Sequence, residues 1–335
     1  MSRIPAEPPI IQAVPANTNR PLWSVMIPVY NCAAYLPQTL RSVLQQDPGA
    51  DQMQIEVVDD CSTDANVEKL VNEIGRGRVL YYRQHQNVGS LRNFETCLNR
   101  ATGHRIHLLH GDDKVRQGFY AKMDALFDQF PQAMAAFCNY IFVDQENNFL
   151  YGNSPESDKD GILENFLLIM AERCATQYVA TVVKREVYES NGGFCGVEYG
   201  EDWEMWGRIA KDHPVAYTPE VLAEYRVHGN NISSGRFRTG QNFEDIRKVL
   251  ARINTYLPQE MRSIMKRKGY REYARYALGN SERIWHVSRD RQTTYTQVKG
   301  ALRMYTDAQL LMKAAKMYLK ILLHPVRKLV GNVKH

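Results

Sequence analysis

The sequence lacks the features that define several large protein classes. Its six cysteines form no Cys-x-x-Cys pair and no histidine lies at zinc-finger spacing from them, which disfavours a disulfide framework and a structural zinc site. No apolar stretch approaches the roughly 18 residues that span a bilayer. Residues 1–20 contain four prolines and no apolar run behind a basic head, unlike a secretory signal. We expect a cytoplasmic protein, dissolved or lying on the inner face of the cell membrane without crossing it.

Glycine-rich phosphate-binding loops are also missing. The chain has neither a G-x-G-x-x-G pattern after its first expected strand nor a G-K-S/T loop. These absences disfavour a nicotinamide dehydrogenase and a P-loop ATPase. If a nucleotide binds, we expect a metal ion rather than a helix N-terminus to neutralise its diphosphate.

The composition of the 335 residues, 44% apolar and 24% charged, is that of a globular protein with one large or two medium domains. The formal charge of +5 is unevenly placed. Residues 299–335 hold eight of the 42 Lys and Arg residues but one of the 37 acidic residues, a net charge of +7, which leaves −2 on the first 298 residues. The body is therefore near neutral and the tail is basic.

Short β-rich runs alternate with segments of helical period in the first third of the chain. This alternation predicts βαβ units and a mostly parallel sheet with helices on its faces. The expected strands cover 24–29, 54–58, 79–82, 105–109, 135–143 and 178–184. The expected helices begin at Pro37 and then cover about 65–74, 91–101, 117–129, 161–173 and 202–211, with further helices from about 241.

Two of the expected strands end in adjacent carboxylates. Asp59 and Asp60 follow the second strand, and Asp112 and Asp113 follow the fourth. Ligands of open parallel sheets bind beyond the carboxyl ends of the strands. One pair could hold a base or a ribose through hydrogen bonds and the other a hard divalent metal. Alternatively, each pair could cap the turn that opens the next helix.

Four segments in this order resemble the inverting, family 2 type of GT-A glycosyltransferase: SVMIPVYN (24–31), VVDDCSTD (57–64), NVGSLRN (87–93) and HGDD (110–113). The resemblance covers roughly residues 22–235. It implies an α/β fold of the GT-A type, with a mostly parallel nucleotide-binding sheet flanked by helices and a C-terminal helical extension. The expected parts are a mobile Pro-rich lead with nothing to bury (1–20), a nucleotide-sugar-binding half (21–115), an acceptor-binding half (116–240) and a basic helical extension (241–335).

The resemblance assigns the first three motifs to the nucleotide. Pro28 and Tyr30 would line the pocket for the base. Asp59 would accept a hydrogen bond from the base, typically uracil. Asp60 would support the turn after the second strand that holds Asp59. Arg92 would reach the base or the diphosphate.

The HGDD motif corresponds to the metal-binding acidic motif of the family. Asp112 would hold the ribose or the metal, and Asp113 would hold Mn²⁺ or Mg²⁺, although His110 replaces the leading aspartate that is frequent there. His228 corresponds to a histidine that closes over the donor and ligates the metal. Arg226 would contact the diphosphate, or else form a salt bridge within its loop.

The segment GGFCGVEYGEDWEMW (192–206) resembles the acceptor-side signature of the family. An inverting transfer needs a base for the acceptor hydroxyl, and a partly desolvated carboxylate suits that role. The resemblance favours Asp202 as this base, with Glu201 as the alternative. Both carboxylates could instead only cap the following helix. Trp203 and Trp206 could stack on a sugar or belong to the core.

The expected activity is the metal-dependent transfer of one sugar from a UDP-sugar to a hydroxyl of a glycan or lipid-linked glycan in surface polysaccharide biosynthesis. Single addition is expected because the Gln-x-x-Arg-Trp signature and the membrane spans of processive synthases are missing. The alternatives are a sugar nucleotidyltransferase and a non-catalytic nucleotide- or sugar-binding scaffold.

The basic tail predicts an amphipathic helix within residues 308–328. Its lysines 313, 316 and 320 share one face, which could attract an anionic membrane surface. The same helix could instead pack on the body or form a homodimer. No nucleic-acid-binding motif accompanies the basic residues, so no nucleic acid is expected. The predicted apolar face consists of Leu311, Ala315, Tyr318 and Leu322.

Overall fold

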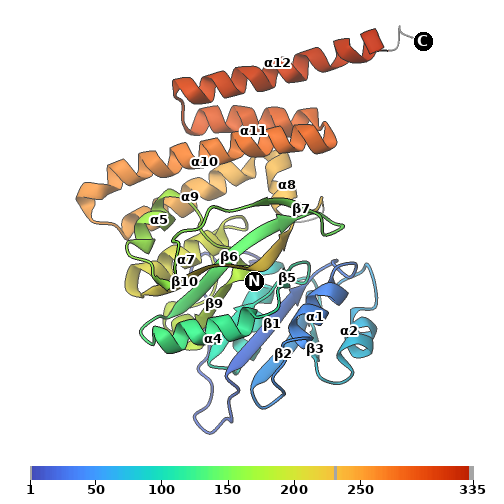
Figure 1. Ribbon diagram of the computed structural model, residues 1–335, viewed down its shortest axis with the longest axis vertical. Helices are drawn as coiled ribbons and strands as arrows, with labels where there is room; N and C mark the ends of the chain where they lie inside the picture. The colour runs from blue at the N-terminus through green and yellow to red at the C-terminus, as the bar shows by residue number, and fades with distance from the viewer. Residues whose placement is uncertain (1, 230–231, 332–335) are drawn as a thin grey trace. The chain divides into compact units, whose positions relative to one another are not determined.

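The computed structural model describes residues 2–229 and 232–331, with side chains up to Leu323 (Figure 1). The chain divides into two compact units. The first comprises residues 1–170 and 174–228, and the second comprises residues 171–173 and 229–335. Within the described ranges, every helix is too short or too polar to cross a membrane.

A mixed β-sheet organises the first unit. Its strands are β1 (Trp23–Val29), β2 (Met53–Asp59), β3 (Leu80–Arg83), β4 (Arg105–Leu108), β5 (Lys114–Val115), β6 (Ala135–Val143), β7 (Phe149–Gly152), β8 (Gly161–Ile162), β9 (Thr181–Lys184) and β10 (Val215–Arg226). The strand order is β3-β2-β1-β4-β9-β6-β10-β5, with β7 paired to β6 and β8 paired to β10.

The two halves of the sheet differ in strand direction. Strand β1 runs parallel to β2 and β4, and β2 runs parallel to β3, as the alternating pattern predicts. Strand β9 runs antiparallel to both of its neighbours, β4 and β6. The expectation of a mostly parallel sheet therefore describes the β3-to-β4 half, and the sheet as a whole is mixed.

The helices of the first unit follow the predicted positions closely, except that α6 (Arg185–Asn191) was not predicted. They are α1 (Leu36–Leu44), α2 (Val67–Gly75), α3 (Ser90–Arg100), α4 (Phe119–Gln129), α5 (Phe166–Glu172), α6 (Arg185–Asn191) and α7 (Glu201–Asp212), with a short 3₁₀ helix, η1 (Tyr178–Ala180). Every residue of β1 is buried, and α1 packs its apolar stripe of Leu36, Leu40 and Val43 into the same core. A strand buried on both faces reads as a continuous apolar run, which made β1 easy to predict.

The Pro-rich residues 1–20 pack against the first unit, in contrast to the sequence-based expectation. The prediction that this segment has nothing to bury is wrong for Ile11, which is 2% exposed. The buried Arg185 also donates a hydrogen bond of 2.7 Å from Nη2 to the main-chain oxygen of Gln12. Composition failed here because proline-rich backbone can still offer carbonyl oxygens to donors on the body.

The second unit is helical. It contains α8 (Ile232–Thr239), α9 (Gln241–Thr255), α10 (Gln259–Ser288), α11 (Arg291–Met304) and α12 (Ala308–Gly331). Helices α10, α11 and α12 lie side by side (Figure 1). Its core includes a buried polar network in which Asn242 Nδ2 donates to Tyr273 Oη at 2.8 Å and to Gln297 Oε1 at 3.1 Å.

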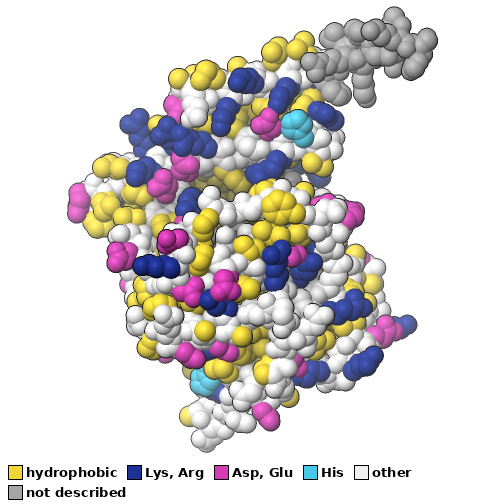
Figure 2. All heavy atoms as spheres, in the orientation of Figure 1, with side chains coloured by type: hydrophobic (Ala, Val, Ile, Leu, Met, Phe, Trp, Pro, Cys, Tyr) yellow, Lys and Arg dark blue, Asp and Glu magenta, His cyan; other side chains and the backbone are white. Residues whose placement is uncertain are grey.

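Helix α12 buries a different face from the predicted one. Its buried positions are Leu310, Ala314, Met317 and Ile321, each one residue before a predicted position. Two of the predicted positions, Leu311 and Leu322, are 49% and 62% exposed. The helix therefore has two apolar stripes, one packed in the second unit and one exposed beside lysines. Figure 2 shows apolar and basic side chains interspersed along the visible face of α12.

Candidate active site

The carboxyl ends of β1, β2 and β4 meet at one edge of the sheet. The register pairs Val29 with Asp59 and Met26 with Leu108, so the loops that follow these strands are neighbours. The first two loops also bind each other, because Thr63 N donates to Asn31 Oδ1 at 2.8 Å. The acidic strand ends predicted from the sequence are therefore brought together.

Asp59 lies at this edge but is fully buried. Its Oδ2 accepts hydrogen bonds from Tyr81 Oη at 2.7 Å and Arg83 Nη1 at 2.5 Å. Its Oδ1 accepts one from Ser62 N at 2.9 Å. Burial and the bond to Asp59 raise the pKa of Tyr81 to about 12. This conformation therefore leaves no exposed Asp59 oxygen for the predicted contact with a base.

Asp60 joins the end of β2 to the turn before α3. Its carboxylate accepts hydrogen bonds from Val88 N at 2.7 Å, Gly89 N at 2.9 Å and Asn87 Nδ2 at 2.9 Å. Burial raises its pKa, and the two main-chain donors oppose that rise. The resemblance implied that Asp60 supports the turn that holds Asp59, whereas the turn that its carboxylate binds in the structure is residues 87–89.

The remaining residues predicted to bind the nucleotide differ in accessibility. Tyr30 follows β1 with its side chain 51% exposed, whereas Pro28 is buried within that strand. Arg92 is engaged within the protein, because Nη1 donates to Glu95 Oε2 at 2.6 Å and Nε donates to the Ser2 oxygen at 3.0 Å. Of these three side chains, Tyr30 is the one most open to a ligand.

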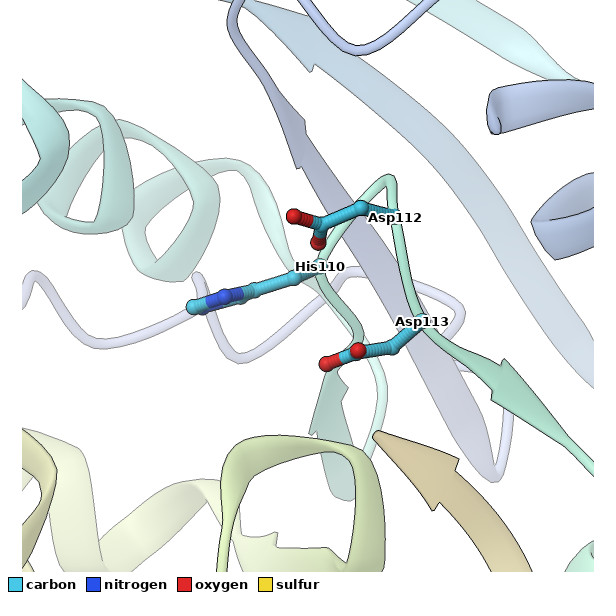
Figure 3. Close-up of side chains that lie close together, drawn as sticks. All are labelled: His110, Asp112 and Asp113. Carbon is cyan, nitrogen blue, oxygen red and sulfur yellow. The ribbon is translucent and has the colours of Figure 1, made fainter. Parts of the chain in front are cut away.

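A metal-binding type of cluster follows β4. The side chains of His110, Asp112 and Asp113 point the same way from their loop, and one potential ligand atom of each lies within 4.8 Å of the others (Figure 3). Gly111 permits the tight path of this loop, because a Cβ there would lie 2.8 Å from Val29 Cγ2.

His228 reaches this cluster from the loop after β10. Its Nε2 lies 2.8 Å from Asp112 Oδ2, and its side chain is 6% exposed. Asp113 Oδ1 accepts a hydrogen bond from Arg226 N at 2.8 Å. The fold thus assembles Asp112, Asp113 and His228, which sequence reasoning had grouped from more than 100 positions apart.

The electrostatics of the cluster suit a cation. Burial would raise the pKa of Asp112, but the bond to His228 and the proximity of His110 hold it below its usual range. Burial and the neighbouring Asp112 raise the pKa of Asp113 well above its usual range. Two buried adjacent carboxylates repel each other, and a divalent cation would relieve that repulsion.

His110 joins the cluster with an available ring nitrogen. Its ring packs against those of Phe94 and Tyr178, with centroid distances of 5.1 and 4.4 Å, and these two rings also contact each other. Its Nε2 is buried and has no hydrogen-bond partner among the described residues. Burial lowers its pKa, which favours the neutral imidazole that binds metals.

Arg226 forms hydrogen bonds with the loops around the cluster, and its side chain does not face an open pocket. Its guanidinium is buried. It donates from Nε to the main-chain oxygen of Asp112 at 2.8 Å and from Nη1 to the main-chain oxygen of Asp144 at 3.0 Å. Nη2 donates to Gln38 Oε1 and Asn147 Oδ1, both at 2.9 Å. Of the two earlier alternatives, a diphosphate contact stays a prediction, and the described partners of the guanidinium are main-chain and side-chain amide oxygens.

A third pair of adjacent carboxylates begins α7. Glu201 and Asp202 are each 8% exposed. Burial raises the pKa of Asp202 to about 6, and burial together with Asp202 raises that of Glu201. Tyr178 Oη donates to Glu201 Oε1 at 3.2 Å, and the same ring contacts His110. Tyr178, which sequence reasoning missed, thereby connects this pair to the metal-type cluster.

The two tryptophans of α7 belong to the core. Trp203 and Trp206 are 4% and 3% exposed. Trp203 Nε1 donates to the Met170 oxygen at 2.6 Å. Of the two alternatives, stacking on a sugar and packing in the core, the structure supports the second.

Comparisons with known proteins agree with this arrangement. Residues 24–190, about half of the chain, match the family described as Glycosyl transferase family 2. A Bacillus subtilis protein named as the teichuronic acid biosynthesis glycosyltransferase TuaG is 28% identical over 247 residues, which are 70% of this chain and 90% of the relative.

Two solved structures share the fold. S. aureus TarS 1–349 in complex with UDP-GlcNAc has a TM-score of 0.62 at 15% identity and covers 85% of this chain and 81% of its own. The mannosyltransferase PcManGT from Pyrobaculum calidifontis, in complex with GDP-Man and Mn²⁺, has a TM-score of 0.57 at 19% identity. The matched region covers 98% of this chain and 86% of PcManGT.

The fold and the strand-end site define a glycosyltransferase of the GT-A type. The chain belongs to glycosyltransferase family 2. The predicted family, fold class and enzyme class are thereby confirmed.

Proposed function

We propose that this enzyme transfers a single sugar, with inversion, from a UDP-sugar to a hydroxyl of a surface glycan. The observation that carries the proposal is the cluster of Asp112, Asp113 and His228 with His110, whose ring contacts Tyr178, the residue that hydrogen-bonds to Glu201 of the buried Glu201–Asp202 pair. A TarS structure holds UDP-GlcNAc, which supports a UDP-linked donor. The name of TuaG supports an acceptor in cell-surface polysaccharide.

Asp112, Asp113 and His228 would hold the divalent metal, Mn²⁺ or Mg²⁺. Carboxylate oxygens suit both ions, and an imidazole nitrogen suits transition metals better than Mg²⁺. The neutral ring of His110 offers a further nitrogen, so the donor set fits Mn²⁺. When bound, such an ion stabilises the negative charge that develops on the departing diphosphate.

Asp202 would act as the base, with Glu201 as the alternative. A carboxylate with a pKa of about 6 is ionised at neutral pH and still accepts a proton as the acceptor hydroxyl attacks the anomeric carbon. Direct attack from the face opposite the leaving group inverts the configuration and needs no covalent intermediate.

Tyr30 would stack on the base, with Pro28 shaping the pocket from within β1. Asp59, Asp60 and Arg226 would act indirectly, because each already binds protein donors or acceptors. Their hydrogen bonds hold the loops after β2, β4 and β10 in place, as described above. Arg92 would reach the nucleotide only with a change in its present contacts.

Helix α12 would place the enzyme at an anionic membrane surface, where a lipid-linked glycan acceptor is found. The segment 308–331 contains no acidic residue. Its exposed face carries Lys313 and Lys316 beside Leu319 and Leu322. Co-sedimentation with phosphatidylglycerol vesicles but not with phosphatidylcholine vesicles would support this placement. A concentration-dependent dimer without vesicle binding would favour the homodimer instead.

Calorimetric titration of the full chain with UDP in the presence of Mn²⁺ tests the proposed donor. We expect saturable binding that weakens when Mn²⁺ is replaced by a chelator. Absence of binding to UDP and to other nucleoside diphosphates would refute the proposal. Release of pyrophosphate from a nucleoside triphosphate in the presence of a sugar phosphate would identify a nucleotidyltransferase.

A further inference from the structure

Residues 2–12, which we call the N-terminal strap, cross from the turn before α3 to the loop before α7. Both of these segments belong to motifs that the family resemblance assigned to the two substrates. None of the expected site residues lies within the strap. Its contacts nevertheless place one charged side chain, that of Arg3, beside the acidic end of β2.

The first residues of the strap contact the turn that Asp60 holds. Arg3 Nη2 donates a hydrogen bond to Asn87 Oδ1, and the Ser2 oxygen accepts one from Arg92 Nε at 3.0 Å. Arg3 also packs against Gly89, where a Cβ would lie 2.9 Å from Arg3 Nε. Gly89 has a φ of +92°, so this close approach coincides with a backbone conformation that favours glycine.

The rest of the strap is firmly anchored. Gly196 N donates to the Pro5 oxygen and Gly193 N donates to the Pro9 oxygen, both at 2.8 Å. Farther along, Ile11 is buried. Because Pro5 lies two residues from Arg3, these anchors hold the backbone of the strap close to Arg3 and limit how far that residue can move from the turn at residues 87–89.

The charge of Arg3 complements the carboxylate of Asp60. Burial raises the pKa of Asp60, and the proximity of this guanidinium, together with the main-chain donors of Val88 and Gly89, opposes that rise. Arg3 remains exposed, and an arginine carries five N–H donors, more than its bond to Asn87 uses. Asp60 N donates to the main-chain oxygen of Val29 at 2.8 Å, and the exposed Tyr30 is the next residue, so the strand end beside Arg3 adjoins the end of β1. Guanidinium donors at this edge match the carbonyl oxygens of a pyrimidine base.

We propose that Arg3 is a specificity-determining residue of the donor site, where its guanidinium donates a hydrogen bond to the O4 carbonyl oxygen of uracil. The inference rests on the proposed UDP-sugar activity. A cytosine base carries an amino group in place of this carbonyl, so the guanidinium would face another hydrogen-bond donor instead of an acceptor. Arg3 therefore favours UDP over CDP, and the strap sets this preference by holding Arg3 in place.

Titration calorimetry with UDP and with CDP, each in the presence of Mn²⁺, tests the role of Arg3. The proteins are the full chain, Arg3→Ala, a variant that lacks Ser2 and Arg3, and Arg41→Ala. The last removes an exposed arginine of α1 and is the matched control for charge. Pro5 and Ile11 remain in every variant, so the anchors of the strap are kept.

We expect Arg3→Ala and the short deletion to weaken UDP binding by about tenfold, the size of one hydrogen bond to a charged group. CDP binding should change less, so the preference for UDP over CDP falls, while Arg41→Ala keeps both affinities. Equal loss of both affinities, no change in either, or tighter UDP binding would overturn the inference. Failure of the unaltered chain to bind either nucleotide would instead refute the proposed function.

Discussion

The pairs Asp59–Asp60 and Asp112–Asp113 lie at the carboxyl ends of β2 and β4, the two strands that flank β1, and have the same sequence, yet their surroundings differ. The first pair is enclosed by donors from the protein, namely Tyr81, Arg83 and the turn at residues 87–89. The second pair meets the nitrogen atoms of His110 and His228.

The difference shows that adjacent aspartates at a strand end do not by themselves make a ligand site. A carboxylate whose lone pairs accept hydrogen bonds from main chain and arginine has a structural role. A carboxylate beside imidazole nitrogens keeps its capacity to bind a cation. The Glu201–Asp202 pair is a third case, in which burial without arginine partners raises the pKa values.

The largest effect on activity is expected for a substitution in the Glu201–Asp202 pair. Asp202→Asn should reduce sugar transfer by about 10²–10⁴-fold, because an amide cannot accept the proton of the acceptor hydroxyl. UDP release from the nucleotide sugar that most raises the melting temperature would measure transfer, and UDP titration should stay nearly unchanged. Asp212→Asn, at the exposed end of the same helix, is the control and should keep full activity. Retained turnover in Asp202→Asn would reject this residue as the base.

Asp59→Asn should act on stability. The change leaves Arg83 without its charged partner and places an amide among buried donors, a loss of about 1–3 kcal/mol in unfolding free energy. Arg83 is 42% exposed, so solvent screening favours the lower part of this range. Urea unfolding measures the loss. Glu73→Gln, which breaks an exposed ion pair with Lys69, should change stability by less than about 0.5 kcal/mol. Equal effects of the two substitutions would remove the distinction between the acidic pairs.

The pH dependence of sugar transfer should follow the ionisation of Asp202. Transfer should fall about tenfold per pH unit below pH 6, because the base must be ionised and its pKa is about 6. Folding raises this pKa, so Asp202 favours the folded state at low pH and that contribution is lost as pH rises from about 4 to about 6. Asp202→Asn should therefore be more stable than the unaltered chain at pH 8. A flat rate profile between pH 5 and 7 would contradict this assignment.

The smallest effect is expected for Tyr81→Phe. It removes one of the hydrogen bonds to Asp59 and should lower the unfolding free energy by about 1 kcal/mol. UDP affinity should be unchanged, since Asp59 is enclosed. A clear loss of UDP affinity without loss of stability would indicate that Asp59 contacts the base, as the family resemblance implied.

The sequence predicted the β3-to-β4 half of the sheet because its strands are apolar runs between amphipathic helices. It missed β10, where Pro219 and Glu220 interrupt the apolar pattern at the register shift between Thr218 and Val221. It also placed the buried face of α12 one residue late, since that helix has two apolar stripes. The pattern of residue types along a helix does not indicate which of two apolar stripes packs against neighbouring helices.

The candidate site was predictable where family motifs carry it, as for Asp112 and His228. The enclosure of Asp59 depends on side chains of β3, and the contact of Tyr178 with His110 depends on tertiary packing. Neither has a local signal in the sequence. Residues 1–20 were misjudged for the same reason, because their partners lie on distant loops.

A titration of Mn²⁺ followed by electron paramagnetic resonance tests the central claim most directly, because free and bound Mn²⁺ give different signals. The unaltered chain and Asp59→Asn should bind the ion, and Asp112→Asn should lose at least about tenfold in affinity while its melting temperature stays within a few degrees. Equal Mn²⁺ affinity in all three proteins would contradict the assignment of the metal to the loop after β4.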